Sequence, residues 1–468
     1  MEMMPPIMFT ALVVFMLIGF PVAFSLAALG LTCAIMSIHL GFFPPDFLQA
    51  LPLRVFGILS NDLLLAIPFF TFMGAILERC GLAEDLLEAT GQLFGSVPGG
   101  LAYAVIVVGA ILGAITGTVA ASVIAMGVIS LPIMMRYGYD MKTATGVIAA
   151  SGTITQLIPP SIVLIVLADQ LSIAGPGADV GAMYLGALGP SLLQTLLFMT
   201  YIFVLSRIRP HWVPPLPKEA RTLHGWTLAR RVLRGMVPSL ALIFLVLGTL
   251  FTRLATPTET GAMGAVGALV LAALHKRLSW RLVWEAMDAT MRLTAMVIFI
   301  LIGSSVFTLV FQGVEGGRWI EHHLSSLPGG VVGFLLFVNI FVFFLAFFLD
   351  FFEIAFIVIP LLAPVAAAMG IDLVWFGVLL CINMQTSFMH PPFGFALFYL
   401  RGIAPKTVKS SDIYLGALPW VGLQVLMVLI VIFWPGLVTG LLDKAPVVDI
   451  ENIEINLEPP PDAPKDNP

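Results

Sequence analysis

The stretch SGTITQLIPP occupies residues 151–160 and places polar side chains and two prolines inside an otherwise apolar segment. A second stretch, NMQTSFMHPP at residues 383–392, does the same in the second half of the chain. Proline has no backbone N–H, and its ring clashes with the preceding helical turn. We therefore predict two helices, 143–168 and 375–400, each broken where the polar residues lead into the prolines.

The chain around these breaks has the composition of a polytopic membrane protein. Its 468 residues are 59% hydrophobic and 10% charged, whereas soluble domains carry about 25% charged residues. Apolar runs of roughly 18 or more residues predict membrane-spanning helices, and at least nine such runs occur. This pattern predicts an all-α protein in a lipid bilayer and excludes nucleic-acid binding. The three cysteines are scattered, so they give no disulfide framework and no metal-ligand spacing.

Two apolar segments, 100–135 and 329–369, are too long for one span and carry polar or small residues at their centres. We predict that each is a re-entrant hairpin of two half-helices, a geometry that requires cover from protein or a water-filled cavity. Ten spans then remain. With an outside amino terminus, the positive-inside rule places the linker 207–234, with its seven basic residues, in the cytoplasm. Both termini are predicted to be periplasmic, including a disordered, acidic, proline-rich tail at 443–468.

An internal repeat relates the two halves of the chain. Each half, 1–206 and 235–442, contains five predicted spans and one hairpin, and the hairpins open with SVPGG and SLPGG. Because five is odd, the second half is predicted to lie upside down relative to the first. Inverted repeats with broken helices near the midplane are typical of secondary transporters, and hairpins entering from opposite faces provide two gates around one central site. These pairs of residues are all 232 positions apart: Pro132 and Pro364, Gly138 and Gly370, Asp140 and Asp372, Pro159 and Pro391.

The segments 46–60 and 279–292 are amphipathic, and each precedes a span. We predict that both are interfacial helices that brace the mobile parts. The alternative is that each simply continues the adjoining span.

The two breaks are also where we expect the chemistry. The freed carbonyls, with hydroxyl and amide oxygens nearby, make an oxygen-rich site suited to Na⁺, and half-helix amino termini attract a carboxylate. His390 is able to titrate or to contact substrate, and a structural hydrogen bond explains it equally well. The residues that we expect to contact substrate are Thr155, Gln156, Pro159, Pro160, His390, Pro391 and Pro392.

Asp350 and Glu353 are acidic residues inside the apolar second hairpin. Acids in a membrane segment are costly and indicate function by default, here cation coordination or a proton relay. The alternative is a hairpin tip exposed to an aqueous cavity.

Five motifs stand in order along the chain: TGTVAASVIAMGVISLP, SGTITQLIPPSIVLIVLADQ, TPTETGAMGAVGA, FFLDFFEIAFIVIPLLAP and NMQTSFMHPPFGFALFYLRG. Through these motifs the chain resembles the large membrane subunit of tripartite ATP-independent periplasmic (TRAP) transporters over nearly all of residues 5–442. The broken-helix extension LADQ and the hairpin sequence FLDFFEIAF are most similar to the branch for mannitol, chloroaromatic and 2-oxo-acid systems.

The resemblance implies a Na⁺-driven importer of organic acids in the bacterial inner membrane, built from a scaffold domain and a mobile transport domain that works as an elevator. It implies two partners, a small four-helix membrane subunit and a periplasmic substrate-binding protein, and Na⁺ as the coupling ion with no cofactor. The sequence departs from the family pattern in having fewer serines at the first hairpin tip and His390 where Thr is more usual. The cation-binding residues implied by the resemblance are Gly117, Thr118, Ser122, Ser151, Thr153, Asp350, Asn383, Gln385, Thr386 and Ser387.

The sequence leaves three other functions to consider. A stand-alone elevator carboxylate carrier that needs no binding protein is the nearest alternative. A membrane-embedded enzyme is disfavoured because no HExxH, GxSxG or His/Asp cluster is present. A channel is disfavoured because paired gates on opposite faces favour alternating access.

Overall fold

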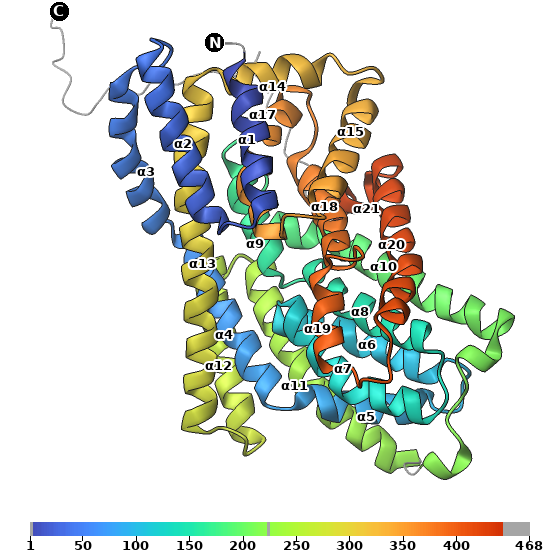
Figure 1. Cartoon of the computed structure of the whole chain (residues 1–468). Coiled ribbons are helices and arrows are strands. Elements are labelled where there is room, and N and C mark those ends of the chain that lie inside the picture. Colours follow the sequence, from blue (N-terminus) through green and yellow to red (C-terminus); the bar gives the residue numbers. More distant parts are fainter. Residues whose placement is uncertain (1–2, 222–224, 443–468) are drawn as a thin grey trace, which may run out of the picture.

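The computed structural model describes residues 3–221 and 225–442, and within these ranges the chain forms helices and no strand (Figure 1). The predicted tail at 443–468 lies outside the described residues. The α-helices are α1 (Met4–Ile18), α2 (Val22–His39), α3 (Ala50–Leu59), α4 (Ala66–Arg79), α5 (Leu82–Phe94), α6 (Gly100–Thr116), α7 (Val119–Arg136), α8 (Met141–Thr153), α9 (Ile162–Ser172), α10 (Val180–Ile208), α11 (Gly225–Phe251), α12 (Pro257–Leu274), α13 (Trp280–Gly313), α14 (Gly316–Ser325), α15 (Gly330–Leu345), α16 (Phe351–Glu353), α17 (Ile359–Ala368), α18 (Leu373–Met384), α19 (Phe395–Ile403), α20 (Ser410–Phe433) and α21 (Gly436–Thr439).

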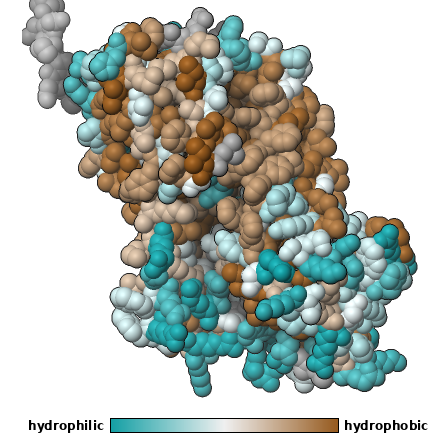
Figure 2. Space-filling model, viewed as in Figure 1, coloured by the Kyte–Doolittle hydropathy of each residue, from teal (hydrophilic) through white to brown (hydrophobic). Residues whose placement is uncertain are grey.

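Among the described residues, eight helices are long and apolar enough to cross a membrane, or up to ten if each of two bent helix pairs counts as one span. The prediction of an all-α polytopic membrane protein is therefore confirmed. Figure 2 shows apolar side chains over the upper part of one face and polar side chains gathered at its lower end, where α5, α7 and α11 lie. The surface thus has an apolar part suited to contact with lipid and a polar end suited to contact with water.

One side of the molecule is a layer of long helices. α13 packs along α2 and α4, and α12 packs against α4 and α11. In Figure 1 this layer stands at the left, beside the helices that carry the two breaks.

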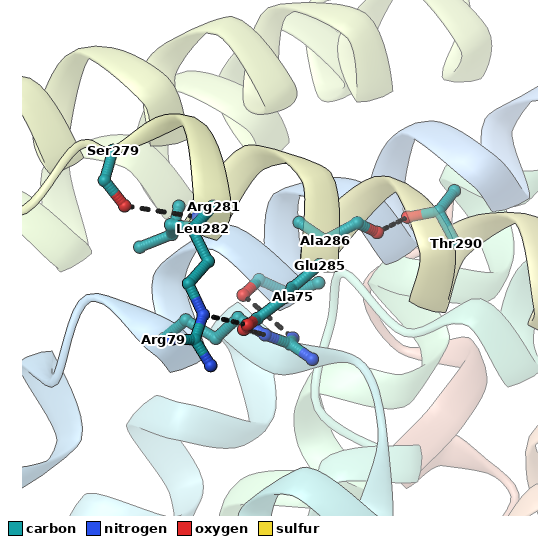
Figure 3. Close-up of polar contacts among 8 residues, drawn as sticks. All are labelled: Ala75, Arg79, Ser279, Arg281, Leu282, Glu285, Ala286 and Thr290. Atoms are coloured by element: carbon teal, nitrogen blue, oxygen red, sulfur yellow. Dashed lines mark hydrogen bonds and ion pairs between the residues drawn. The ribbon is translucent and has the colours of Figure 1, made fainter.

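The first turns of α13 correct one prediction. Residues 279–292 are not a separate interfacial helix, because they begin the continuous 34-residue α13 after the cap residue Ser279. Figure 3 shows their contacts: Glu285 accepts from the Arg281 side chain at 2.8 Å and also pairs with Arg79 of α4 at 3.6 Å. No glycine or proline interrupts residues 280–293, so nothing ends the helix where its amphipathic part meets the apolar span. The alternative, a continuation of the span, is the observed arrangement.

The matching segment of the first half does end at a bend. Residues 45–59 form helix, and their axis is bent by 45° from that of residues 62–79. Asn61 lies at the bend, where its side chain accepts from the backbone N–H of Leu63 and starts the next helix.

The order of the helices repeats along the chain. The series α5 to α10 is followed again by α14 to α20, with Gly99 and Gly329 preceding corresponding helices. The hairpin breaks fall at residues 117–118 and 346–350, and the helix breaks at residues 154–161 and 385–394. The inverted orientation of the two halves in the bilayer and the re-entrant course of the two hairpins stay predictions.

The helices that lead into the two breaks form the centre of the molecule. Every residue of α18 is buried, and so is every residue of α8 from Thr143 onward. α9 packs against α18, which brings the first break beside the helix that leads into the second. The polar stretches are therefore inside the protein, as a binding site between repeats requires.

Candidate substrate and cation site

The first break begins where α8 ends at Thr153 and a 3₁₀ turn, Ile154–Gln156, follows. Thr155 Oγ1 donates to the carbonyl of Gly152 at 2.6 Å and lies 3.2 Å from the hydroxyl of Ser122. Ser122 belongs to α7, the second arm of the first hairpin. The hairpin and the broken helix are thus joined by side-chain hydroxyls.

Helix α6, the first arm of that hairpin, lies against α8 without intervening side chains. A Cβ added to Gly109 would lie 2.8 Å from the Cβ of Ser151, and one added to Gly113 would lie 2.9 Å from the Cα of Thr155. Both distances are shorter than van der Waals contact allows, so only glycine permits this approach. The two glycines therefore determine how closely α6 approaches Ser151 and Thr155.

The second break has the same plan with different side chains. Thr386 and Ser387 each donate at 2.7 Å to a carbonyl three residues earlier. Asn383 donates to the carbonyl of Asn339 at 2.7 Å and lies 3.1 Å from the side-chain oxygen of Asn339. Asn339 lies on α15, the first arm of the second hairpin. Here too a polar side chain joins hairpin to break.

The two breaks adjoin each other. The thiol of Cys381, one turn before the second break, lies 3.5 Å from the carbonyl oxygen of Gln156 in the first break. The same carbonyl accepts from Ser161 at 2.5 Å. Ser161 also caps α9 by accepting from the backbone N–H of Val163. The carbonyl of Gln156 is therefore a junction between the halves.

Both hairpin tips reach this centre. Gly117, with a φ of +62°, lies where a Cβ would be 3.4 Å from Ile162 at the start of α9. At the other tip, the ring of Phe351 lies 6.3 Å from that of Phe388 in the second break. Thr118 and Asp350 are half-buried at their tips.

Asp350 and Glu353 have a structural role that the sequence analysis did not predict. Asp350 accepts from the backbone N–H of Glu353 at 2.8 Å, and Glu353 accepts from that of Asp350 at 2.9 Å. This reciprocal arrangement is a capping box, which starts a helix by satisfying its free N–H groups. The predicted role of Asp350 as a cation ligand stays a prediction.

Several buried polar atoms in the breaks have no hydrogen-bond partner among the described residues. They are the hydroxyl of Ser151, both amide atoms of the Gln156 side chain, the amide nitrogen of Gln385 and both ring nitrogens of His390. An unpaired buried polar atom costs about 1–3 kcal/mol, so these atoms are candidates for binding a ligand. The donor set is neutral oxygen and N–H, and no group of three or more His, Cys, Asp or Glu residues within the described ranges could hold a metal ion.

The other predicted residues are placed as follows. Pro159 and Pro160 are buried in the first break, whereas Pro391 is half-buried and Pro392 is exposed. His390 is buried, and its ring stacks on Phe347 with centroids 4.2 Å apart and meets the edge of Phe343 at 4.3 Å. His390 therefore joins the second break to the second hairpin through aromatic contacts.

Three polar residues at the site were missed by the sequence analysis. Gln194 donates to the side-chain oxygen of Gln385 at 2.8 Å, and Gln424 donates to the hydroxyl of Thr153 at 3.0 Å. Asn339 is the third. A signal for the glutamines was present, because the sequence YLGAL at 184–188 recurs at 414–418 and each copy is followed by a glutamine at the same spacing.

This architecture, with paired broken helices buried between repeated helix series, defines a polytopic helical membrane transporter. Residues 9–437 match the family described as "Tripartite ATP-independent periplasmic transporter, DctM component", and the chain belongs to this family. It is accordingly a TRAP transporter large permease and not an enzyme.

Relatives agree with this assignment, and a solved structure has a similar fold. The chain is 30% identical to the C4-dicarboxylate TRAP transporter large permease DctM of Rhodobacter capsulatus, over 92% of this chain and 97% of the relative. It is 26% identical to the sialic acid TRAP permease SiaM of Vibrio cholerae, over 89% and 93%. Its fold is similar to that of the Alcanivorax borkumensis YdaH transporter, with a TM-score of 0.57 at 16% identity over 83% of this chain and 87% of that one.

Proposed function

We propose that this permease drives the import of an organic acid by symport with Na⁺. The carboxylate substrate is delivered by a periplasmic binding protein, and a small four-helix membrane subunit completes the assembly in the bacterial inner membrane. The hairpins and broken helices form a transport domain that moves as an elevator against the layer of α2, α4, α12 and α13. Both chain termini face the periplasm in this arrangement.

The observation that carries the proposal is the set of buried, unpaired polar atoms at the two breaks. The Ser151 hydroxyl and the Gln156 side-chain oxygen suit Na⁺, which is coordinated by oxygens at unwound helices in transporters. The N–H groups of Gln156 and Gln385 suit a carboxylate, since they donate and carry no charge that requires neutralisation. A cation and an anion bound together would also balance each other's charge in a buried site.

The names of the relatives support an organic anion as the substrate class. They are TRAP permeases for C4-dicarboxylates, isethionate, 2,3-diketo-L-gulonate and sialic acid. These compounds share an acid group and differ in size, so the shared group indicates the class and not the individual substrate. The similarity to the mannitol, chloroaromatic and 2-oxo-acid branch remains a prediction.

The test is uptake of radiolabelled organic acids into liposomes that contain the permease with its small subunit. Uptake that requires both an inward Na⁺ gradient and the binding protein is the expected result. Uptake with Na⁺ but without the binding protein would establish the alternative, a stand-alone carboxylate carrier. Uptake driven only by a proton gradient would contradict Na⁺ coupling and would shift attention to Asp350, Glu353 and His390.

A further inference from the structure

We propose that Gln194 and Gln424 are a reciprocal pair of positioning residues, each of which holds the break of the opposite half in its ion-binding geometry. The proposal rests on the Na⁺ coupling proposed above. Neither glutamine needs to contact the ion or the substrate, because each acts through a residue of the break.

The contacts cross between the two halves. Gln194, on α10 of the first half, donates at 2.8 Å to Gln385 in the second break. Gln424, on α20 of the second half, donates at 3.0 Å to Thr153 at the first break. Both glutamines are fully buried. Each break is therefore held by a helix that belongs to the other half of the chain.

The four residues are equivalent in pairs. Thr153 and Gln385 are 232 positions apart, like the prolines of the two breaks. Gln194 and Gln424 are 230 positions apart, and each follows a copy of YLGAL. The same contact is thus made twice with its partners exchanged, which two unrelated hydrogen bonds would not do.

The helices that carry the glutamines are locked together. Trp420 lies one turn before Gln424 on α20, and its ring meets Phe198 and Tyr201 of α10 at 4.9 Å and 5.1 Å. Phe198 in turn lies one turn after Gln194. This packing gives both amides a fixed base from which to orient the breaks.

Stability of the fold alone does not account for the glutamines. The side-chain oxygens of Gln194 and Gln424 have no partner among the described residues, and neither does the amide nitrogen of Gln385. Replacing both partners of each pair by apolar side chains of the same shape would avoid these unpaired atoms at little or no loss of stability. What only the amides supply is orientation: Thr153 donates to the carbonyl of Ala150 at 2.8 Å while accepting from Gln424, which fixes its hydroxyl.

The first test measures the Na⁺ concentration that gives half-maximal uptake in proteoliposomes of the full assembly. Gln194→Met and Gln424→Met each keep the length of the side chain and remove the amide. We expect each to raise the half-saturating Na⁺ concentration about fivefold, the equivalent of one hydrogen bond of about 1 kcal/mol, with maximal uptake at saturating Na⁺ within about twofold of wild type. An unchanged Na⁺ requirement would overturn the proposal.

Two control variants separate positioning from general packing. Ser191→Ala removes a buried hydroxyl of α10 that bonds only within its own helix. Gln92→Met removes an amide that bonds to the carbonyl of Ala220, far from the breaks in sequence. Neither should change the half-saturating Na⁺ concentration. A rise in these controls as large as in the glutamine variants would show that any loss of buried polarity is enough.

The second test is a set of double-mutant cycles on the same quantity, because residues in one hydrogen-bonded pair are non-additive. We expect coupling within the crossed pairs, Gln424→Met with Thr153→Val and Gln194→Met with Gln385→Met. We expect weaker coupling when the partners are exchanged, Gln194→Met with Thr153→Val and Gln424→Met with Gln385→Met. Equal coupling in all four cycles would overturn the crossed assignment. A wild-type assembly that ignores Na⁺ would instead overturn the proposed function itself, so the two failures are distinguishable.

Discussion

The side-chain amide of Asn383 donates to the backbone carbonyl of Asn339 at 2.7 Å, across 44 positions of sequence. This contact fastens the first arm of the second hairpin to the helix that breaks beneath it. It is made to the backbone, so its strength depends on Asn383 more than on the side chain of Asn339.

That asymmetry gives the first prediction. Asn383→Ala removes both contacts to Asn339, whereas Asn339→Ala keeps the 2.7 Å bond to the backbone; it loses the 3.1 Å contact and the bond that the Asn339 side chain donates to the carbonyl of Leu335 within its own helix at 2.8 Å. We expect Asn383→Ala to lower Na⁺-driven uptake at least about tenfold and to destabilise the protein by about 1–3 kcal/mol, and Asn339→Ala to have a clearly smaller effect. Uptake and thermal unfolding of the two purified variants check this. Equal losses would mean that the backbone contact does not matter.

The second prediction concerns the contact between α6 and α8. Gly113→Ala would place a methyl group 2.9 Å from the backbone of Thr155, so α6 must move away from the turn that follows α8. We expect a loss of about 1–3 kcal/mol of stability from this overpacking, seen as a lower melting temperature in detergent. Gly248→Ala is the matched control, since a Cβ there meets nothing within 4 Å. Alanine favours a helix more than glycine does, so the control should melt at or above the wild-type temperature.

The third prediction separates the two roles of Asp350. Asn caps helices about as well as Asp does, so Asp350→Asn keeps the cap and removes only the charge. If Asp350 coordinates the coupling ion as predicted from the sequence, the half-saturating Na⁺ concentration rises about tenfold while the melting temperature changes little. Glu353→Gln also preserves the capping box and serves as the comparison. A normal Na⁺ requirement in Asp350→Asn would leave the carboxylate with the cap as its whole function.

The fourth prediction tests the orientation in the membrane. The three native cysteines are all buried, so the background of labelling by an impermeant maleimide should be low. Lys218 and His322 are both exposed. We expect a cysteine introduced by His322→Cys to react in intact spheroplasts, and one introduced by Lys218→Cys to react only after permeabilisation. The reverse pattern would place the basic linker outside and contradict the predicted topology.

Much of the fold could be predicted from the sequence because its signals are local. Proline at Pro159 and glycine at Gly117 interrupt apolar runs, and the broken helices and hairpin tips follow at these positions. The false interfacial helix at 279–292 shows the limit of such signals. An amphipathic pattern indicates which face of a helix is polar but not where the helix ends, and no residue there ends it.

The contacts of the site were harder to predict because they depend on tertiary packing. Gln194 and Gln424 are single polar residues in long apolar helices, and a pattern read along one helix gives no indication of their partners 191 and 271 positions away. The capping box of Asp350 and Glu353 is different, since its spacing of three residues was visible in the sequence. It was missed because the two acids were interpreted as cation or proton ligands or as part of an exposed tip, and not as helix caps.

The contacts of Gln194 and Gln424 show the symmetry with which the two halves of the chain pack together. Gln194 of the first half contacts Gln385 of the second, and the equivalent Gln424 of the second half contacts the equivalent Thr153 of the first. Such an exchange of equivalent partners is the rule of an isologous interface in a two-fold symmetric dimer. A half separated from its partner would lose the helix that holds its own break, and a second half would restore it. In this respect the chain resembles a dimer whose two subunits are covalently joined, and the proposed binding site belongs to neither subunit alone.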